Sequence, residues 1–450
     1  MEAKVKSWFK KKHNGQQRIL EDPHKGEASE FYFACRNGDI DKVKQMLPII
    51  PYHQLNQLEP NGSTALHAAT YFGHLDIVRL LLHEYGSQRH LRNRHGFTAY
   101  EEAETDEMRQ LYHRPSGENR FNDDSMVIKE AFEIISLATN KTETDGSDDD
   151  DNAKKPDERY FISYEKNEMQ MCLDGLSGVK ALFQSPVGRS IMKNGMKLKL
   201  CKGAGYSDEE YKYVTSKKYR HDALKKVLDE HVPINHPDYQ QCCELLKEYI
   251  QQGTIESLFT LYTMDTPFYR QSSMLSNTLG FPFFFHLADL KQRYYQGYSY
   301  RGTRLTRDKL NEYRWALKNK DSILSPLTFA STSMVRDVAE DFADKPSSSS
   351  SDKIRTIFIY HFPQPCDTAI NLSEIPEYKL PCISFFKNEQ EILVGPRTYF
   401  KVTKIEPDQC KEQYTIYLEN LCGEQKTVLQ AIKILLGDDM KNKTSKKLRD

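Results

Sequence analysis

The chain has 450 residues, a formal net charge of −1 and a sequence pI near 6.9. A charge this close to zero gives no overall reason to expect binding to nucleic acid or attraction to an anionic membrane. The length predicts about three domains, and the most apolar run, residues 281–287, is far too short to span a bilayer.

The cysteines and the first residues indicate a cellular compartment. The nine cysteines are odd in number and follow no regular framework, and Cys242 and Cys243 are adjacent rather than spaced as a CxxC metal motif. The first residues lack the apolar core of a secretory signal. We therefore expect reduced thiols in a cytoplasmic protein without a transmembrane segment.

Residues 1–28 form a basic, polar N-terminal segment with Trp8 and Phe9 between lysines. A frayed, solvated terminus and an amphipathic segment on a membrane surface both fit this composition.

Residues 29–115 contain an internal repeat. Gly38 recurs as Gly73, a spacing of 35 residues, and Gly62 recurs as Gly96, a spacing of 34. A period near 33 is that of ankyrin repeats, and residues 61–82 resemble one turn and helix pair of this family. The resemblance implies an all-α module that binds a protein; a purely structural cap is the alternative. We expect His67 to have a structural role in the repeat turn rather than to bind a metal.

The middle of the chain is less informative. Residues 116–158 are predicted to be an acidic linker because of the run of four aspartates at 148–151, with a helix expected over 125–139. Residues 159–238 carry no assignable function, although residues 160–164 are typical of a strand.

Residues 239–425 are predicted to form one α+β domain. Apolar residues return at helical spacing from Tyr239 onward, and strands are expected at residues 355–362, 392–394, 398–405 and 414–418. Residues 426–450 are predicted to be a helix, over 428–436, and a basic tail. A frayed end and a nuclear-import patch are both compatible with that tail.

Three motifs in this domain carry candidate chemistry. They are Tyr300-Arg301-Gly302, Ser331-Thr332-Ser333 and Glu389-Gln390-Glu391. On a strand, residues i and i+2 point to the same face, so Glu389 and Glu391 are expected to face one place. Each motif alone also has an explanation without a functional role: a surface arginine, an ordinary strand, and a solvated acidic strand end.

In this order the three motifs resemble the mono-ADP-ribosyltransferases of the arginine–serine–glutamate class, over roughly residues 240–420. The resemblance implies two packed mixed sheets preceded by a helical part. It also implies NAD as substrate and no metal, and cleavage of the nicotinamide–ribose bond through a transition state of oxocarbenium character.

The resemblance further implies the roles of site residues. The catalytic set would be Arg301, Ser331, Glu389 and Glu391. Arg301 would hold the pyrophosphate, Ser331 would orient the glutamate and the ribose, Glu391 would stabilise the developing positive charge, and Glu389 would contact the acceptor. In relatives, a glutamate at the position of Glu389 is associated with arginine as the acceptor. The NAD-binding set would be Tyr262, Tyr300, Arg301, Gly302, Ser331 and Phe342. A core position is the alternative for Phe342.

The combined hypothesis is an NAD–protein-arginine ADP-ribosyltransferase. Its ankyrin module would select a protein acceptor with an exposed arginine, and nucleic acid is not expected as a partner. Two rivals remain: an NAD glycohydrolase that uses the same site, and an inactive ankyrin-type interaction scaffold. The acceptor protein, the oligomeric state, the balance between transfer and hydrolysis and the source organism do not follow from the sequence.

Overall fold

The computed structural model describes residues 28–114, 132–137, 161–164, 216–268, 279–320, 322–344, 353–408, 410 and 412–421. The chain divides into two compact units: Met1–Pro115 with Asp229–Leu245, and Ser116–Leu228 with Leu246–Asp450. The predicted helix at 428–436, both termini and the serine-rich run 346–351 lie outside the described residues. Within the described part, no helix is long and apolar enough to cross a bilayer.

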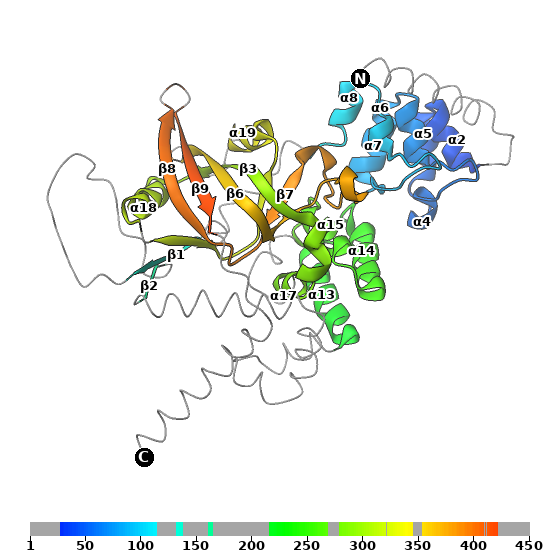
Figure 1. Ribbon diagram of the computed structural model, residues 1–450. Coiled ribbons are helices and arrows are strands. Elements are labelled where there is room, and N and C mark those ends of the chain that lie inside the picture. The colour runs from blue at the N-terminus through cyan, green and yellow to red at the C-terminus, as the bar shows by residue number, and fades with distance from the viewer. Residues whose placement is uncertain are drawn as a thin grey trace. The chain divides into compact units, whose positions relative to one another are not determined.

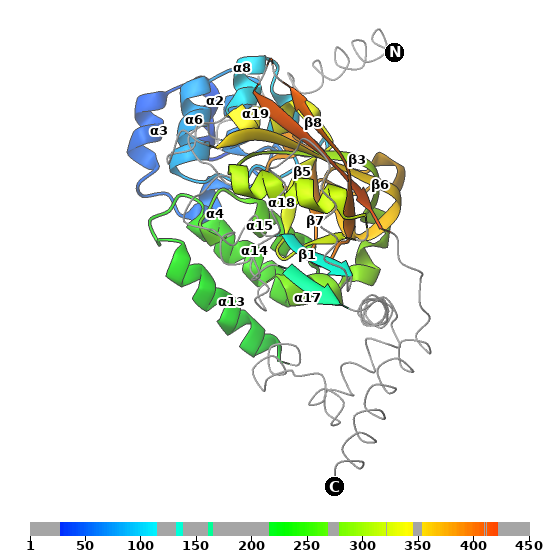
Figure 2. The same ribbon diagram turned by 90° about the vertical axis from the view of Figure 1, so that its left-hand side faces the viewer.

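The first unit is built from short helices in two rows. Helices α2, α5 and α7 stack on one another (Figure 1), while α3 and α6 form a second row against them (Figure 2). Their small and apolar residues allow this close stacking, as predicted for a repeat module. The helices are α2 Glu30–Asn37, α3 Ile40–Met46, α4 Tyr52–Leu55, α5 Ala65–Tyr71, α6 Leu75–Arg79, the π-helical turn η1 Leu80–Glu84, α7 Ala99–Glu102 and α8 Asp106–Gln110.

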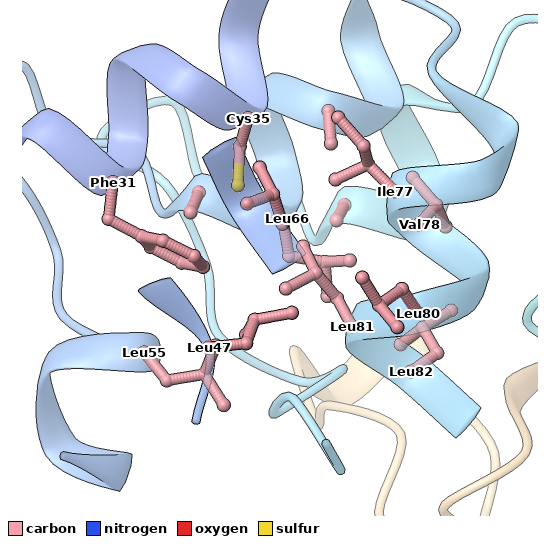
Figure 3. Close-up of a cluster of buried hydrophobic side chains, with 14 of the residues drawn as sticks. Phe31, Cys35, Leu47, Leu55, Leu66, Ile77, Val78, Leu80, Leu81 and Leu82 are labelled. Carbon is pink, nitrogen blue, oxygen red and sulfur yellow. The ribbon is translucent and has the colours of Figure 1, made fainter. Parts of the chain in front are cut away.

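Glycine turns separate these helices. Gly62 and Gly73, which the sequence predicts at tight turns, have φ of 79° and 78°, in the left-handed region that glycine adopts without strain. Behind the turns, Leu66 of α5 and Leu81 of η1 lie in a buried cluster with Cys35 of α2 (Figure 3). The repeat pattern therefore produces one continuous core shared by neighbouring helix pairs.

His67 ties one repeat to the next. Its Nδ1 lies 2.7 Å from Thr64 Oγ1 at the N-terminus of α5, and its Nε2 lies 3.0 Å from the carbonyl oxygen of Phe97. Burial lowers the pKa of the imidazole to about 4, so the ring is neutral at pH 7. Both ring nitrogens thus have hydrogen-bonding partners within the repeats, which agrees with the predicted structural role.

Gly86 is expected to be the most substitution-sensitive glycine turn of this unit. Its φ is 59°, and a Cβ there would lie 2.2 Å from the carbonyl oxygen of Pro237, which belongs to the same unit. Gly86→Ala combines left-handed strain of about 1–2 kcal/mol with overpacking of about 1–3 kcal/mol. We expect a clear loss of unfolding free energy, measured by urea denaturation of the full chain.

Gly96→Ala is the matched control for Gly86→Ala. Gly96 also has positive φ, 80°, but no atom lies within 4 Å of a Cβ built on it. The Gly96→Ala variant should therefore lose only the part of the unfolding free energy that comes from left-handed strain, without the overpacking part. Equal losses in the two variants would contradict the contact between Gly86 and Pro237.

The second unit combines helices with a large sheet. Its helices are α15 Glu256–Thr263, α17 Gly280–Phe285, η2 Leu287–Arg293, α18 Arg307–Lys318, α19 Arg336–Asp344, η3 Pro376–Tyr378 and η4 Lys387–Glu389, while α13 Lys217–His231 and α14 Tyr239–Gln252 each have residues in both units. Its strands are β1 Phe132–Leu137, β2 Phe161–Tyr164, β3 Tyr294–Leu305, β4 Ile323–Pro326, β5 Ala330–Ser333, β6 Ile354–Asn371, β7 Glu391–Val394, β8 Phe400–Asp408 and β9 Gln413–Asn420. All the strands that the sequence predicts are present.

The strands do not form the two separate sheets that the resemblance implies. The nine strands of the described segments form one hydrogen-bonded sheet in the order β2-β1-β4-β8-β9-β6-β3-β5-β7, and β7 also pairs with β6. Strands β3, β5, β7 and β6 therefore close a ring, as in a barrel. The sheet is mixed as expected, because β6 runs parallel to β9 and β1 parallel to β2.

Strand β6 causes this closure. It is 18 residues long, and its first half pairs with β9 while its last residues, Ala369–Asn371, pair with β7. Between the halves, Pro363 and Pro365 offer no N–H to a ladder, and register shifts opposite Tyr295 mark a bulge. Bulges bend strands, so β6 pairs with β9 and β3 in the interior of the sheet and also with the terminal strand β7.

The helix expected at 125–139 is wrong for its described part. Residues 132–137 form β1, paired antiparallel with β4 and parallel with β2. The adjacent β-branched Ile134 and Ile135 favour a strand, and pairing with two neighbouring strands outweighs the local helical spacing.

Two helices cover the sheet near its centre. Helix α18 packs beside β8, and α19 packs across β3 and β6 (Figure 1). Strands β3 and β6 run side by side along most of the length of β3 (Figure 2). Helix α19 and the ends of β5 and β7 thus come together at the middle of β3, where Arg301 and Gly302 lie.

Candidate active site

An open hollow lies where β3, β5, β7 and α19 meet. It gathers residues from all three sequence motifs and from the helix that follows the serine motif. Its lining residues are Tyr300, Arg301, Gly302, Ser331, Thr332, Ser333, Val338, Phe342, Glu389 and Glu391. Residues up to 91 positions apart in the chain therefore share one site.

Arg301 connects two of the contributing strands. Its backbone pairs with Phe358 of β6, and its guanidinium Nη1 donates a hydrogen bond of 2.9 Å to the carbonyl oxygen of Ser331 on β5. This contact fixes the side chain at the edge of the hollow. A guanidinium has five N–H donors in a planar fork, a geometry that suits the oxygens of a phosphate or carboxylate.

The three residues of the serine motif make different contacts. Thr332 Oγ1 donates to the carbonyl oxygen of Ile392 at 3.0 Å and lies 2.9 Å from Ser299 Oγ, within hydrogen-bonding distance. Ser333 Oγ donates to the carbonyl oxygen of Glu389 at 2.7 Å and accepts from Val335 N. Ser331 Oγ is buried and has no hydrogen-bond partner among the described residues. The motif thus leaves one hydroxyl available to a ligand.

The two glutamates reach the hollow by a route that differs from the prediction. Only Glu391 belongs to β7; Glu389 ends the 3₁₀ turn η4. Between them Gln390 has φ of 42°, a left-handed conformation. The prediction that strand alternation brings Glu389 to the same face as Glu391 is therefore wrong. The turn positions Glu389 instead. Both side chains are buried, 6% exposed for Glu389 and 2% for Glu391.

Each carboxylate oxygen of Glu391 has a different environment. Oε2 accepts a hydrogen bond of 2.8 Å from Ser384 Oγ. Oε1 is buried without a hydrogen-bond partner within the described segments. An unpaired buried polar atom is costly, and a hydroxyl donor from a ligand would satisfy it. The sequence-based expectation that Ser331 orients this glutamate is not met, because Ser384 makes that contact.

Gly302 determines how closely α19 approaches β3. A Cβ at this position would lie 1.7 Å from the carbonyl oxygen of Ala339. Only glycine permits this approach, which brings Val338 and Phe342 of α19 to the hollow. Arg304 secures the end of the helix by donating to the carbonyl oxygen of Ala343. The glycine predicted to face a ligand thus also supports the packing of a helix.

Two predicted NAD-binding residues occupy different positions. Tyr300 lines the hollow and pairs with Ser333 across β3 and β5. Tyr262 is buried in α15, with its ring centroid 5.9 Å from that of Phe329, and is not among the lining residues. The structure therefore brings together every predicted site residue except Tyr262.

Sequence reasoning missed Ser384 and gave no site role to Thr332, Ser333 or Val338. Val338 follows the serine motif, and its helical spacing with Val335, Ala339 and Phe342 was the available signal. Ser384 precedes Glu391 by seven residues, and the short turn η4 between them has no side-chain period that extends to both residues, so no spacing rule identifies it.

Comparison with known proteins identifies the repeats. Residues 29–107 match the sequence model of the ankyrin-repeat family, in three copies. A curated relative, inversin from Danio rerio, is 35% identical over 68 residues, which cover 15% of this chain and 7% of inversin. The chain thus spans a small fraction of that relative. The N-terminal part of the protein contains ankyrin repeats.

Among solved structures, the chain is similar to bacterial ADP-ribosyltransferases. Vis toxin from Vibrio splendidus is 16% identical, covering 61% of this chain and 91% of its own, with a TM-score of 0.22. HopU1 of Pseudomonas syringae is 14% identical, with coverages of 44% and 86% and a TM-score of 0.29. Exoenzyme S from Pseudomonas aeruginosa, bound to carba-NAD, is 19% identical, with coverages of 47% and 97% and a TM-score of 0.25. These low TM-scores leave the functional argument to the site itself.

Proposed function

We propose that the hollow binds NAD and that the protein transfers ADP-ribose from NAD to an arginine side chain of a protein, releasing nicotinamide. One observation carries this proposal. Ser331, Glu391 and Arg301 line one hollow, and two of these residues each have a buried polar atom, Ser331 Oγ and Glu391 Oε1, without a hydrogen-bond partner among the described residues. A sugar hydroxyl beside a phosphate suits that combination.

Each group would act on a different part of NAD. Arg301 would donate to the pyrophosphate, for which its fork of N–H groups is suited. Glu391 Oε1 and Ser331 Oγ would bind ribose hydroxyls, and Phe342 would pack against the nicotinamide ring. These contacts would hold the substrate while the bond from C1′ to the nicotinamide nitrogen stretches.

The reaction would proceed through a positively charged sugar. Nicotinamide leaves with the electron pair of its bond to C1′, and positive charge develops over C1′ and the ring oxygen. The fixed carboxylate of Glu391 would stabilise that charge in a buried site, where electrostatic interactions are strong. A guanidinium nitrogen of the acceptor would then bond to C1′ and lose a proton.

Glu389 would orient the acceptor. The residue is only 6% exposed, and the hydrogen bond from Ser333 Oγ to its backbone carbonyl fixes the turn that contains it. A carboxylate pairs with a guanidinium through two parallel hydrogen bonds, which is the basis for proposing arginine. The ankyrin repeats would select the acceptor protein, and the reaction would take place in the cytoplasm.

Glu389→Gln tests the acceptor role. We expect transfer of label from NAD to poly-arginine to fall by about 10- to 100-fold, which corresponds to a lost charged hydrogen bond. Nicotinamide release into water should change much less, because Glu391 remains. The measurement pairs labelled-acceptor counts with nicotinamide quantified in the same reaction.

The wild-type protein provides the comparison for the rival functions. Release of free ADP-ribose by the wild type without any labelled acceptor would favour an NAD glycohydrolase. Failure of the folded protein to bind or consume NAD would refute the proposal and favour an interaction scaffold.

A further inference from the structure

We propose that Ser384 is a positioning residue that holds Glu391 in its reactive orientation, and this inference rests on the proposed function. The residue lies outside the three sequence motifs. It acts on the catalytic group through one side-chain contact and does not line the hollow itself.

The contact leaves the two carboxylate oxygens of Glu391 with separate tasks. Ser384 Oγ donates to Oε2 at 2.8 Å, and both side chains are buried. With Oε2 fixed in this way, the carboxylate cannot rotate freely about its terminal torsion, which is otherwise broad. Oε1, which has no hydrogen-bond partner in the described part of the chain, is then the oxygen left for a ligand in the hollow that Glu391 lines.

The backbone around Ser384 is held from both sides. On one side, Thr260 Oγ1 donates to the carbonyl oxygen of Ile383 at 2.8 Å. On the other, Phe385 N donates to Thr263 Oγ1 at 2.8 Å. Helix α15 therefore clamps the residues before and after Ser384. Because the backbone of Ser384 is fixed, its hydroxyl determines the orientation of the carboxylate rather than moving with it.

A buried arginine secures the rest of the loop. Arg293 is 3% exposed, and its guanidinium donates to the carbonyl oxygens of Asn371, Ser373 and Pro381. Leu372 N in turn donates to the carbonyl oxygen of Glu391 at 2.9 Å. The loop and the first residue of β7 thus form one rigid support, which is the arrangement a positioned catalytic group requires.

Steady-state kinetics of NAD cleavage test the inference. For Ser384→Ala we expect kcat to fall about tenfold or more, the range for a lost hydrogen bond to a charged group, while KM for NAD changes less than about threefold. Ser384→Thr keeps the hydroxyl and should restore most of kcat. Ser373→Ala is the matched control: it lies on the same loop, and its hydroxyl has no hydrogen-bond partner among the described residues.

A second measurement does not depend on activity. In a double-mutant cycle of Ser384→Ala and Glu391→Ala, we expect the unfolding equilibrium constants from urea denaturation to deviate from the product of the single effects by about fivefold or more. Multiplicative effects would overturn the inference even if the wild type is inactive. An active wild type whose kcat falls equally in Ser384→Ala and Ser373→Ala would overturn the inference and leave the proposed function intact.

Discussion

Glu391→Gln is expected to lower the rate of NAD cleavage by about 100- to 1,000-fold, the range observed when one preorganised electrostatic group is removed. Glutamine has the same shape, and its carbonyl oxygen can still accept the hydrogen bond from Ser384. It lacks the negative charge that the sugar requires in the transition state. The shape and the hydrogen bond from Ser384 are retained, and the amide nitrogen in place of Oε1 can donate to a ribose hydroxyl oxygen, so the affinity for NAD should change much less than the rate. Nicotinamide release and NAD binding by calorimetry measure the two effects separately.

A neighbouring glutamate provides the control for Glu391→Gln. Glu377 is exposed in the turn η3, so Glu377→Gln makes the same chemical change outside the hollow and should leave the rate unchanged. A thermal melt checks that both variants are folded. Rapid NAD cleavage by folded Glu391→Gln would exclude this carboxylate as the catalytic group.

Local chemistry explains which parts of the fold could be predicted. Gly62 and Gly73 mark turns because only glycine adopts positive φ without strain, and the repeat spacing of these glycines is visible in the sequence. The strands were also predictable, because apolar residues at strand spacing indicate a buried face. The closure through β6 was not predictable, because it depends on which partner each half of one long strand selects.

The site could be predicted only in part, for a related reason. Arg301, Ser331 and Glu391 lie on strands whose order matches a known pattern, so their convergence was expected. The position of Glu389 depends on the left-handed Gln390, a conformation that the sequence Glu-Gln-Glu does not indicate. The contact from Ser384 depends on a loop that tertiary hydrogen bonds fix, and such contacts leave no periodic signal.

Gly302→Ala is expected to have the second large effect, on both stability and NAD binding. The added methyl group would clash with backbone atoms, which cannot move aside as a side chain can. The added Cβ would meet the carbonyl oxygen of Ala339 at 1.7 Å, its carbon at 2.7 Å and the backbone nitrogen of Ala343 at 2.9 Å. No truncation of Ala339 can relieve a clash with its own carbonyl, so α19 must move away from β3. We expect a loss of unfolding free energy of about 1–3 kcal/mol or more, measured by urea denaturation.

The displacement of α19 should also affect NAD. Val338 and Phe342 would leave the hollow with the helix, so we expect NAD binding to weaken by about tenfold or more, since burying one large apolar side chain is worth about 1.5–3 kcal/mol. Gly297→Ala, on the same strand, is the control: its Cβ would meet only the side chain of Tyr295, whose hydroxyl lies at 3.3 Å, although its φ of 124° adds backbone strain. That variant should lose stability without losing NAD affinity. If the two variants lost NAD affinity equally, the close approach of α19 to Gly302 would not be what forms the hollow.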